Sequence, residues 1–310
     1  MRQIFFIVTP VTWALLLSIP MAASATEWHV PGDFSTIQDA IDSSDVVNGD
    51  SIRVGPGDHR GATITKKVTI HGSLSSVIVD GPKPWKDRSF RAGFLFRGPK
   101  AENGSGTTIH HLKFENLDFP IFASQKGAVV SDVKIHDCLI VNAIQGITMW
   151  HADYWEVRNN QIVDLRAQGG GGIGILVGSH SGDDSFENSV MENEIYGTVA
   201  VHPEEKGGYS AVGIYLVSDH RGRRTGGLVE GNLVARNEIE LESDAPHLIR
   251  VVAMELEDTR NNSARYSVTE NQVKSNLIEA MDDLQPLILT IPPVLSNPVN
   301  KIEKNRFIKD

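Results

Sequence analysis

A short motif of the form apolar-x-x-Asn-x-apolar recurs along the second half of the chain and constrains the fold more than any other feature. A repeat at spacings of a few tens of residues indicates the stacked coils of one solenoid. Two related segments precede the full copies, Ile109–Phe114 and Ile135–Ile140, the latter with Cys138 in the Asn position. The full copies are Val157–Ile162, Val190–Ile195, Val234–Ile239, Val268–Val273 and Ile302–Phe307.

The fixed Asn position favours β-structure over helices. Asn is a weak helix former, but it tolerates tight bends and can hydrogen bond to the coils above and below. Parallel strands of successive coils lie about 4.8 Å apart, so Asn residues at one offset would form an internal ladder. Antiparallel hairpins, the alternative, would not need Asn at a fixed offset. A second Val- and Ile-rich strand recurs between the motifs, starting at Gly146, Gly174, Gly213 and Leu248.

The N-terminal part adds a predicted helix and a predicted first strand. Residues 34–42 form a short amphipathic pattern in which Ser35 and Gln38 match a capping box. Residues 49–57, GDSIRVGPG, follow as a strand between glycines. Together with the Asn repeat, this opening resembles the right-handed parallel β-helix proteins of the pectate-lyase-like superfold over about residues 28–308. The resemblance implies an all-β solenoid of about eight coils, with an N-terminal α-helix that caps the core.

The first 25 residues predict export. Arg2 precedes an apolar run that ends in the small-x-small cleavage pattern Ala23-Ser24-Ala25. Residues 1–25 are therefore interpreted as a signal peptide and residues 26–310 as one β-helix domain. An uncleaved N-terminal membrane anchor is the alternative. We expect a secreted or periplasmic protein with no membrane span after cleavage.

Charge and cysteine content narrow the range of partners. The net charge of −10 disfavours nucleic acid and anionic membranes. A polyanionic sugar would need local arginines or a bound cation to reverse this field. The single cysteine, Cys138, lies in a strand pattern. We expect a buried, unreactive thiol and no internal disulfide.

Polar residues gather just after the second strand of successive coils. If the coils stack in register, these groups lie about 5 Å apart and form one patch. Histidines and carboxylates suit acid–base chemistry on a polysaccharide, arginines suit its carboxylates or sulfates, and aromatic rings suit its sugar faces. A solvated polar turn is the alternative. The candidate catalytic residues are His151, Asp153, His180, Asp219 and His220, and the candidate substrate-binding residues are Trp150, Tyr215, Arg221 and Arg224.

Two long segments are predicted to form the walls of a groove beside this patch. Residues 164–172 end in four glycines, and residues 201–209 carry His202, Glu204 and Glu205. The glycines are not followed by the Lys-Ser/Thr of a phosphate-binding loop or by a helix pattern. Long connections of this kind often flank a binding site.

A second column of residues competes with the first. His71, His110, His136 and Arg158 each follow the apolar anchor of the other strand, and alternation places them on the outside. They suit a metal or an anion. The resemblance includes periplasmic accessory β-helix proteins of copper enzymes, for which this column would be the functional one.

The residues and the resemblance together predict an exported carbohydrate-active protein, a lyase or hydrolase of an acidic polysaccharide. The sequence lacks the signatures of glycoside hydrolases and alginate epimerases of this fold; only Asp183-Asp184 and Gly178-Ser-His180 come near them. A non-catalytic glycan-binding or cell-surface protein, or an accessory protein of a metalloenzyme, therefore stays open. The expected partner is a polysaccharide or cell-surface glycan. No cofactor is certain, and Ca²⁺ is the one ion left open.

Overall fold

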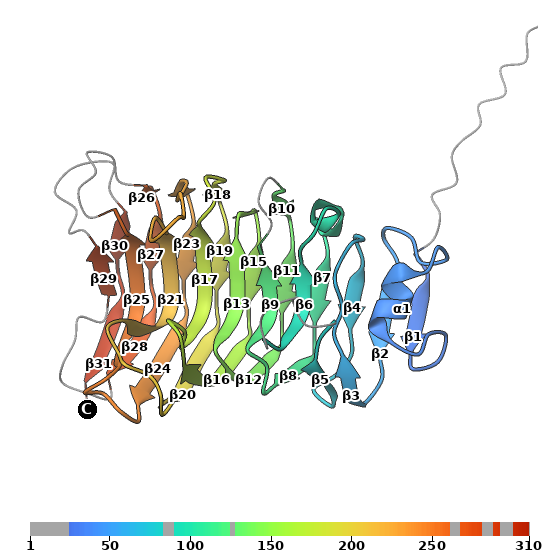
Figure 1. Cartoon of the computed structure of the whole chain (residues 1–310), viewed down its shortest axis with the longest axis horizontal. Coiled ribbons are helices and arrows are strands. Elements are labelled where there is room, and N and C mark those ends of the chain that lie inside the picture. The colour runs from blue at the N-terminus through green and yellow to red at the C-terminus, as the bar shows by residue number, and fades with distance from the viewer. Residues whose placement is uncertain are drawn as a thin grey trace, which may run out of the picture.

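The chain forms a right-handed parallel β-helix, as the Asn repeat and the resemblance predict. The computed structural model describes residues 25–82, 90–124, 128–260, 267–280, 288–291 and 300–309. In these ranges the strands of successive coils pair in parallel. Figure 1 shows them side by side along one long axis, from the blue N-terminal coils to the red C-terminal ones. The predicted signal peptide lies outside the described residues, apart from Ala25.

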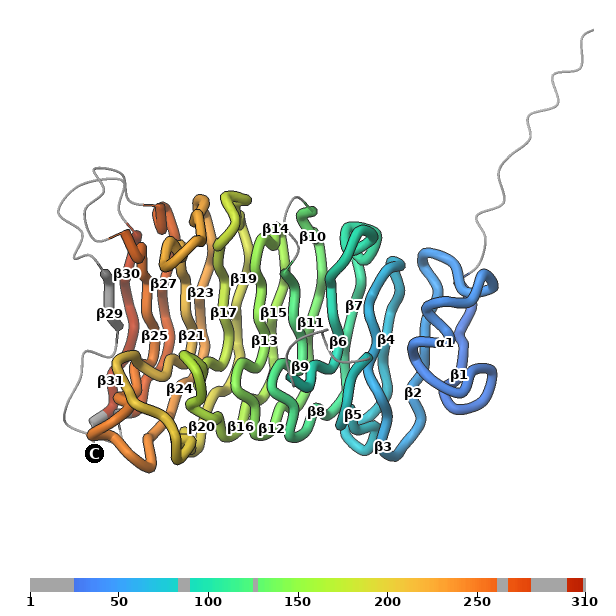
Figure 2. Tube along the Cα trace, viewed as in Figure 1, coloured from blue at the N-terminus to red at the C-terminus, as the bar shows by residue number. Residues whose placement is uncertain are grey.

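Three long sheets, named A, B and C here, form the walls of the solenoid (Figure 2). Sheet A consists of β1 (Glu27–Val30), β2 (Ser51–Val54), β4 (Thr69–His71), β7 (Thr108–His110), β11 (Lys134–His136), β15 (Glu156–Arg158), β19 (Ser189–Met191), β23 (Leu233–Ala235), β27 (Gln272–Lys274) and β30 (Lys301–Glu303). Sheet B consists of β3 (Gly57–Arg60), β5 (Ser76–Asp80), β8 (Lys113–Glu115), β12 (Leu139–Ala143), β16 (Gln161–Ala167), β20 (Glu194–Val201), β24 (Glu238–Ser243), β28 (Leu277–Ala280) and β31 (Arg306–Lys309). Sheet C consists of β6 (Ala92–Phe96), β9 (Phe119–Ala123), β13 (Gln145–Trp150), β17 (Ile173–Ser179), β21 (Ser210–Ser218), β25 (Arg250–Asp258) and β29 (Ile288–Ile291).

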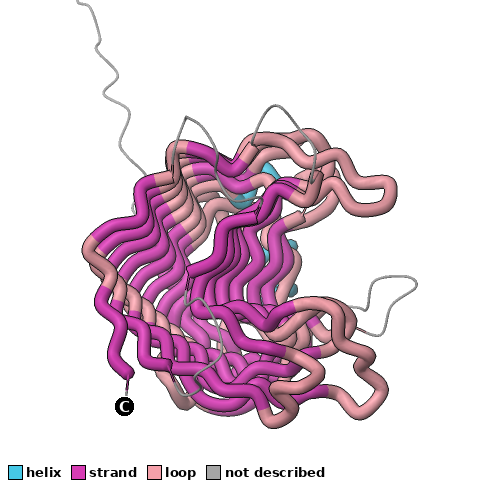
Figure 3. Tube along the Cα trace, turned by 90° about the vertical axis from the view of Figure 1, so that its left-hand side faces the viewer, coloured by secondary structure: helices cyan, strands magenta, loops and turns pink. Residues whose placement is uncertain are grey.

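Each central coil passes through sheets A, B and C in that order and then turns back to sheet A. Figure 3 looks along the stack, so the strands of successive coils lie behind one another and loops extend beyond them. Sheet A contains ten strands among the described residues, more than the eight coils expected, because the first coils carry no Asn motif. Short strands close the corner between sheets C and A. They are β10 (Val130–Ser131) with β14 (Ala152–Asp153), and β18 (Ser185–Phe186) with β22 (Val229–Glu230) and β26 (Val268–Thr269).

The N-terminal helix α1 (Ile37–Asp42) is shorter than the predicted range, and its cap is a different residue. The side chain of Thr36, not Ser35, accepts a hydrogen bond from the main-chain N of Asp39 at 3.1 Å. Gln38 does not complete a capping box, because its side chain bonds to Asp42 at 3.0 Å and to the main-chain N of Thr63 at 2.8 Å. The predicted capping box is therefore wrong, and a Thr N-cap replaces it. The other short helix, η1 (Ala101–Gly104), is a 3-10 turn between β6 and β7.

The core of the solenoid consists of one contiguous apolar cluster that runs the length of the stack. Inward-facing positions repeat in register: Ile109, Ile135 and Val157 follow one another on sheet A, each fully buried. Ile37 and Ile41 of α1 belong to the same cluster at the N-terminal end. Stacked branched aliphatic side chains therefore fill each coil and rest on those of its neighbours.

Asn side chains, all buried except the half-buried Asn305, form two parallel ladders at the bends that flank sheet A. In each ladder the side-chain amide of one Asn donates to the side-chain oxygen of the next, at 2.8–3.0 Å, and that oxygen also accepts from a main-chain N at the previous bend. A residue with positive φ precedes most of these Asn residues, as a tight bend requires. The first ladder is Asn160, Asn193, Asn237, Asn276 and Asn305, and the second is Asn188, Asn232, Asn271 and Asn300.

One of the five motif copies read from the sequence was assigned to the wrong place. Asn271 belongs to the second ladder, and the fourth member of the first ladder is Asn276. The two ladders lie five residues apart on each coil, so segments on both sides of the strand match the same short pattern. Cys138 stands where the first ladder begins, and its main-chain N donates to Asn160 at 3.1 Å. Its thiol is buried, as predicted, and burial raises its pKa to about 12.

Removing one interior Asn should destabilise the whole solenoid. Asn193→Ala deletes hydrogen bonds to Asn160, Asn237 and main-chain groups and leaves their buried partners unsatisfied. We expect a loss of roughly 3 kcal/mol, since each unsatisfied buried group costs ~1–3 kcal/mol. Urea unfolding measures it. Gln161→Ala, which removes one exposed amide contact to Glu194, is the matched control, and equal losses in the two variants would contradict a structural role for the ladder.

Candidate functional site

The outer face of sheet C is covered rather than solvated. All seven residues of β17 and eight of the nine in β21 are buried, so side chains on both faces of these strands avoid water. The outward-facing ones form a second apolar cluster, separate from the core. Its buried members are Phe122, Trp150, Ile173, Leu176, Val212, Tyr215 and Val217. Sheet C therefore provides an apolar, partly aromatic floor.

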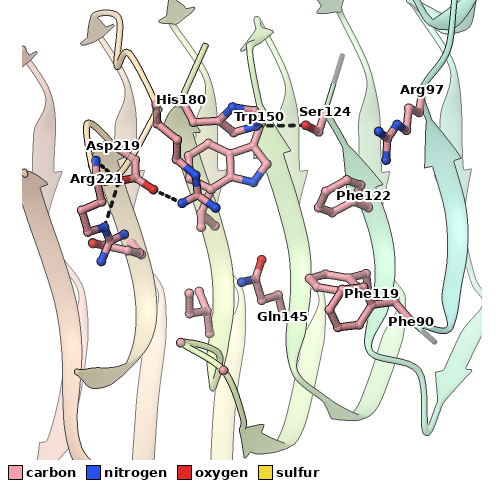
Figure 4. A pocket seen from close by; sticks show the side chains of 16 residues that line it. Phe90, Arg97, Phe119, Phe122, Ser124, Gln145, Trp150, His180, Asp219 and Arg221 are labelled. Carbon is pink, nitrogen blue, oxygen red and sulfur yellow. Dashed lines mark hydrogen bonds and ion pairs between the residues drawn. The ribbon is translucent and has the colours of Figure 1, made fainter. Parts of the chain in front are cut away.

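A pocket of about 630 Å³ lies over this floor. Its residues come from strands and loops of several successive coils, from β6 to β21 and the turn that follows β21. Figure 4 shows Phe119 and Phe122 on one strand, β9, and Trp150 on the neighbouring strand, with Arg97 toward one end and Arg221 toward the other. The pocket has the size of a small-molecule or oligosaccharide site, and its length runs across the strands, along the solenoid axis.

The two long segments predicted as groove walls contact each other beside the pocket. The main-chain N of Gly169 donates to a carboxylate oxygen of Glu205 at 2.7 Å, and the hydroxyl of Tyr209 donates to the same oxygen at 2.9 Å. Gly169 and Gly170 line the pocket. The prediction of a wall is confirmed for the glycine segment, and Glu205 fastens the second segment to it.

The indole of Trp150 lies over Gly178 of the next coil, the residue paired with it in register. A Cβ atom at Gly178 would stand 2.5 Å from the Trp150 ring and 2.9 Å from a methyl group of Val217. The absence of a side chain at this position is therefore what allows the indole to lie along the sheet. Gly178 shapes the floor, although no property of the residue itself suggests a binding role.

His180 is a neutral imidazole at the edge of the pocket. Its Nε2 lies 3.0 Å from the hydroxyl of Ser124, two coils away, and its Nδ1 lies 2.7 Å from the hydroxyl of Ser181. Burial, with the nearby His151 and Arg224, lowers the pKa of His180 to about 4. The ring is therefore uncharged above that pH and can accept a proton through one of its nitrogens.

Asp219 holds two arginines at the same edge of the pocket. Its side chain is fully buried, and its two oxygens bond to Arg221, at 2.8 Å, and to Arg224. Burial raises the pKa of Asp219, but these arginines outweigh burial and keep it below its ordinary value. A carboxylate with both oxygens occupied is a poor proton acceptor. Asp219 therefore orients the guanidinium groups instead of acting as the partner of a histidine.

A pair of glutamates on β25 extends the floor beyond Tyr215. Glu255 pairs with Tyr215 in register, and Glu257 accepts a hydrogen bond from the Tyr215 hydroxyl. Glu255 is 6% exposed. Burial and the neighbouring Glu257 raise the pKa of Glu255 to about 7. Glu255 thus keeps its proton in a substantial fraction of molecules near neutrality, a condition that suits a general acid.

Six of the nine predicted site residues lie together in the pocket lining, and three do not. The glycines near the start of β13, β17 and β21 align in register, but the predicted histidines follow them by five, six and seven residues. Successive side chains of an extended chain point to opposite sides. A shift of one residue per coil therefore prevents the three histidines from pointing in the same direction. The residues in the lining are Trp150, His180, Tyr215, Asp219, Arg221 and Arg224.

The other three predicted residues bond within the corner loops. His151 is fully buried, and its Nδ1 lies 3.1 Å from a main-chain carbonyl oxygen of Asp183. The Nε2 of His220 lies 3.0 Å from the hydroxyl of Ser218, the last residue of β21. Asp153 accepts a hydrogen bond from the main-chain N of Phe186 at 2.8 Å. These contacts support the walls of the pocket from behind.

The sequence analysis missed the residues at the N-terminal end of the pocket. Phe90, Arg97, Phe119, Phe122 and Ser124 all line it. Only the strand register could have identified them. β9 lies next to the strand that carries Trp150, and a reader of the sequence would have to align it with the later coils, starting from the Asn motifs. The coils before residue 130 carry no Asn motif from which to count.

The described part of the chain contains neither a metal-binding cluster nor a membrane-spanning helix. Within those ranges, no group of three or more His, Cys, Asp or Glu side chains is arranged to hold a metal ion. No helix there has the length and apolar character needed to cross a bilayer. The Ca²⁺ and export predictions stay predictions.

Comparison with known proteins yields structural neighbours only. No family model and no curated protein matches the sequence. Among solved structures, the chain is similar to the rice weevil pectin methyl esterase (13% identity, 93% of this chain and 88% of that chain, TM-score 0.46) and to the carrot pectin methylesterase (12%, 94% and 84%, TM-score 0.48). An alginate lyase from a Paenibacillus species is 13% identical over 91% and 95% of the chains, with a TM-score of 0.37. The likeness concerns the course of the backbone, so the chemistry of the pocket has to follow from its own residues.

Filling the space above Gly178 should disturb the floor. In Gly178→Ala the new methyl group collides with the Trp150 indole, and we expect a stability loss of roughly 1–3 kcal/mol from overpacking. Urea unfolding of the single and double variants measures it. Trp150→Ala should reduce the penalty of Gly178→Ala to the part that comes from the Val217 methyl, and Gly55→Ala, whose Cβ meets nothing closer than 3.4 Å, is the control. An undiminished penalty without the indole would contradict this account.

Glu255 should make stability depend on pH. Its folded pKa of about 7 lies above the unfolded value, so its contribution is fully present at low pH and is lost between pH ~4.5 and ~7. Glu255→Gln should therefore gain roughly 3 kcal/mol over the wild type on going from pH 4 to pH 8. Chemical unfolding at the two pH values measures the difference. Glu238→Gln, an exposed change on β24, should show no such gain, and a flat difference for Glu255→Gln would refute the raised pKa.

Proposed function

We propose that this chain is an exported carbohydrate-active protein that binds an acidic polysaccharide along sheet C. One observation carries the proposal: an acidic chain has a pocket of opposite charge. The net charge of the chain is −10, whereas the lining contains three arginines, Arg97, Arg221 and Arg224, against the single carboxylate of Asp219. The lining therefore has a net charge of +2, which attracts an anion.

The two kinds of lining residue divide the recognition of such a polymer. The rings of Trp150, Phe122 and Tyr215 offer apolar surfaces to the faces of sugar rings. Arg221 and Arg224 offer planar donor groups to a carboxylate or sulfate. The pocket runs along the solenoid axis, so successive sugars would lie over successive coils.

His180 and Arg224 support a lyase reaction on a uronic acid. Arg224 lies near enough to His180 to lower its pKa, and a sugar carboxylate bound to Arg224 would acidify the adjacent C–H. Neutral His180 would take that proton, the electron pair would form a C=C bond, and the glycosidic C–O bond would break as the resulting imidazolium or water protonates the departing oxygen. Hydrolysis is the alternative reaction, and the Glu255–Glu257 pair beside the pocket favours it.

A non-catalytic glycan-binding protein is the second candidate function. It is favoured by the contacts of the two polar groups in the lining. Both nitrogens of His180 lie within hydrogen-bonding distance of serine hydroxyls, and both oxygens of Asp219 are bonded to arginines. Such a satisfied network suits recognition as well as catalysis.

A panel of polyuronates and sulfated polysaccharides, with a neutral glucan as control, tests the proposal. Absorbance of an unsaturated product reports lyase activity, reducing ends report hydrolysis, and calorimetry reports binding. For a lyase, His180→Ala should lower kcat about 100-fold with binding retained, and Arg224→Gln should mainly weaken binding. His59→Ala, on sheet B, is the matched control.

The outcomes separate the candidates. Binding of acidic polymers without turnover selects the non-catalytic protein. Turnover that survives in His180→Ala but is lost in Glu255→Gln selects hydrolysis through the glutamates. Failure to bind any acidic polymer, or equal binding of the neutral glucan, would reject an acidic polysaccharide as the ligand.

A further inference from the structure

A column of six basic side chains runs along the outside of sheet A, on a different face from the pocket. The residues are paired coil by coil in the strand register, with no interruption. All six lie at outward-facing strand positions, and none is fully buried. We call them the basic column. Its members are His29, Arg53, His71, His110, His136 and Arg158.

The central histidines of the basic column form a regular stack. The rings of His71 and His110 are 5.2 Å apart with planes at 9°, and those of His110 and His136 are 4.9 Å apart with planes at 5°. His111 lies edge-on to His110 at 5.0 Å. The predicted column is therefore in strict register, even though residues 82–107 separate its first two histidines. The three rings thus form one line of stacked imidazoles on the outside of sheet A.

Acidic groups contact five of the six members of the basic column. Glu27 lies within 3.8 Å of His29, Arg53 and His71, and Asp33 lies 3.3 Å from His29. The remaining contacts are His136 with Asp137 at 2.7 Å, Arg158 with Glu156 at 2.7 Å and Lys134 with Glu156 at 3.7 Å.

Protonation of the histidines would reverse the charge of this strip. Arg53, Arg158 and Lys134 against the four carboxylates give a net charge of −1 when the histidines are neutral. Each protonated histidine adds one positive charge, so protonation of two or more of them makes the strip positive. Burial, then His136, His71 and His111, lowers the pKa of His110 to about 4. Burial is the larger cause, and the neighbouring histidines add a repulsion that a bound anion would offset.

We propose that the basic column is a second binding site, which takes a linear acidic polysaccharide along the solenoid axis at mildly acidic pH. The charges repeat once per coil, at a spacing of about 4.8 Å. This is comparable to the length of one sugar ring, so a polyuronate with one carboxylate per sugar can match the charges one to one. The site lies on sheet A and does not depend on the function proposed for the pocket.

Binding at this site should take up protons. An anion over the stack stabilises the charged imidazoles and so raises their pKa values, which makes affinity and protonation reciprocal. Affinity should therefore rise as pH falls from 7.5 to 5.5 and should weaken with added salt, since the interacting charges are exposed.

Calorimetry with sodium polygalacturonate on the full chain tests the proposal. At low salt we expect about tenfold tighter binding at pH 5.5 than at pH 7.5, the effect of about one additional charge interaction of 1.4 kcal/mol. Repeating the titration in two buffers of different ionisation enthalpy measures the protons taken up. His110→Gln should reduce that uptake, and Arg53→Gln should weaken binding at pH 5.5 about threefold.

Two control variants separate this site from the pocket and from general charge. Arg60→Gln removes one exposed, ion-paired charge on sheet B and should leave the pH-dependent binding unchanged. Arg224→Gln should weaken polyuronate binding in the pocket at both pH values without reducing the proton uptake, whereas His110→Gln should reduce the uptake, so the failure of either site is distinguishable. Thermal melts show whether each variant is folded.

Three outcomes would overturn the proposal. Affinity independent of pH, or absence of proton uptake, would remove the histidines from the site. An equal loss in Arg60→Gln would show non-specific attraction. Equal or tighter binding of a single-stranded polynucleotide under the same conditions would show a general polyanion surface instead of a polysaccharide site.

Discussion

Hydrogen bonds between buried asparagine side chains set the register on which the rest of this solenoid depends. In each ladder the amide of one coil donates to that of the next, and each oxygen also holds a main-chain N at the bend. A slip of one residue would break this network and exchange the inward and outward faces of the strand. The register that buries the aliphatic core is thus also the one that places Trp150 over Gly178 and Tyr215 beside Glu255.

The buried charge of Asp219 gives the pocket its preorganisation. A fully buried carboxylate is stable only when it is paired and hydrogen-bonded, and here Arg221 and Arg224 satisfy that need. Both guanidinium groups are consequently held before any ligand arrives, so a bound anion would not have to order two long side chains. The positive pocket of an acidic chain therefore rests on one negative side chain beneath it.

The sequence predicts the fold well because the bends of the coils require a particular residue type. Asn at a fixed offset indicates a bend wherever it recurs. The prediction assigns the wrong bend only at Asn271, because both bends of that coil match the same pattern. The site is predicted in part, because Trp150, His180 and Tyr215 belong to coils that the motif aligns. The histidines lie in turns beyond the aligned strands, where a shift of one residue per coil cannot be recognised from the sequence. Nothing in the sequence aligns Phe122 with the later coils. Gly178 matters through the space it leaves, which the sequence does not display.

The two ladders step by the same number of residues from coil to coil, 44, then 39, then 29, after a first interval of 33 in the longer ladder. The number of residues in a coil therefore varies widely, whereas the spacing between the two Asn bends of one coil stays at five residues. All of the added chain lies outside the bends and the strand between them, in the connections around sheets B and C. These connections can therefore change in length and composition, in evolution or by design, while the Asn bends and the apolar core stay the same. A scaffold of this kind could exchange one ligand for another by changes in its loops alone.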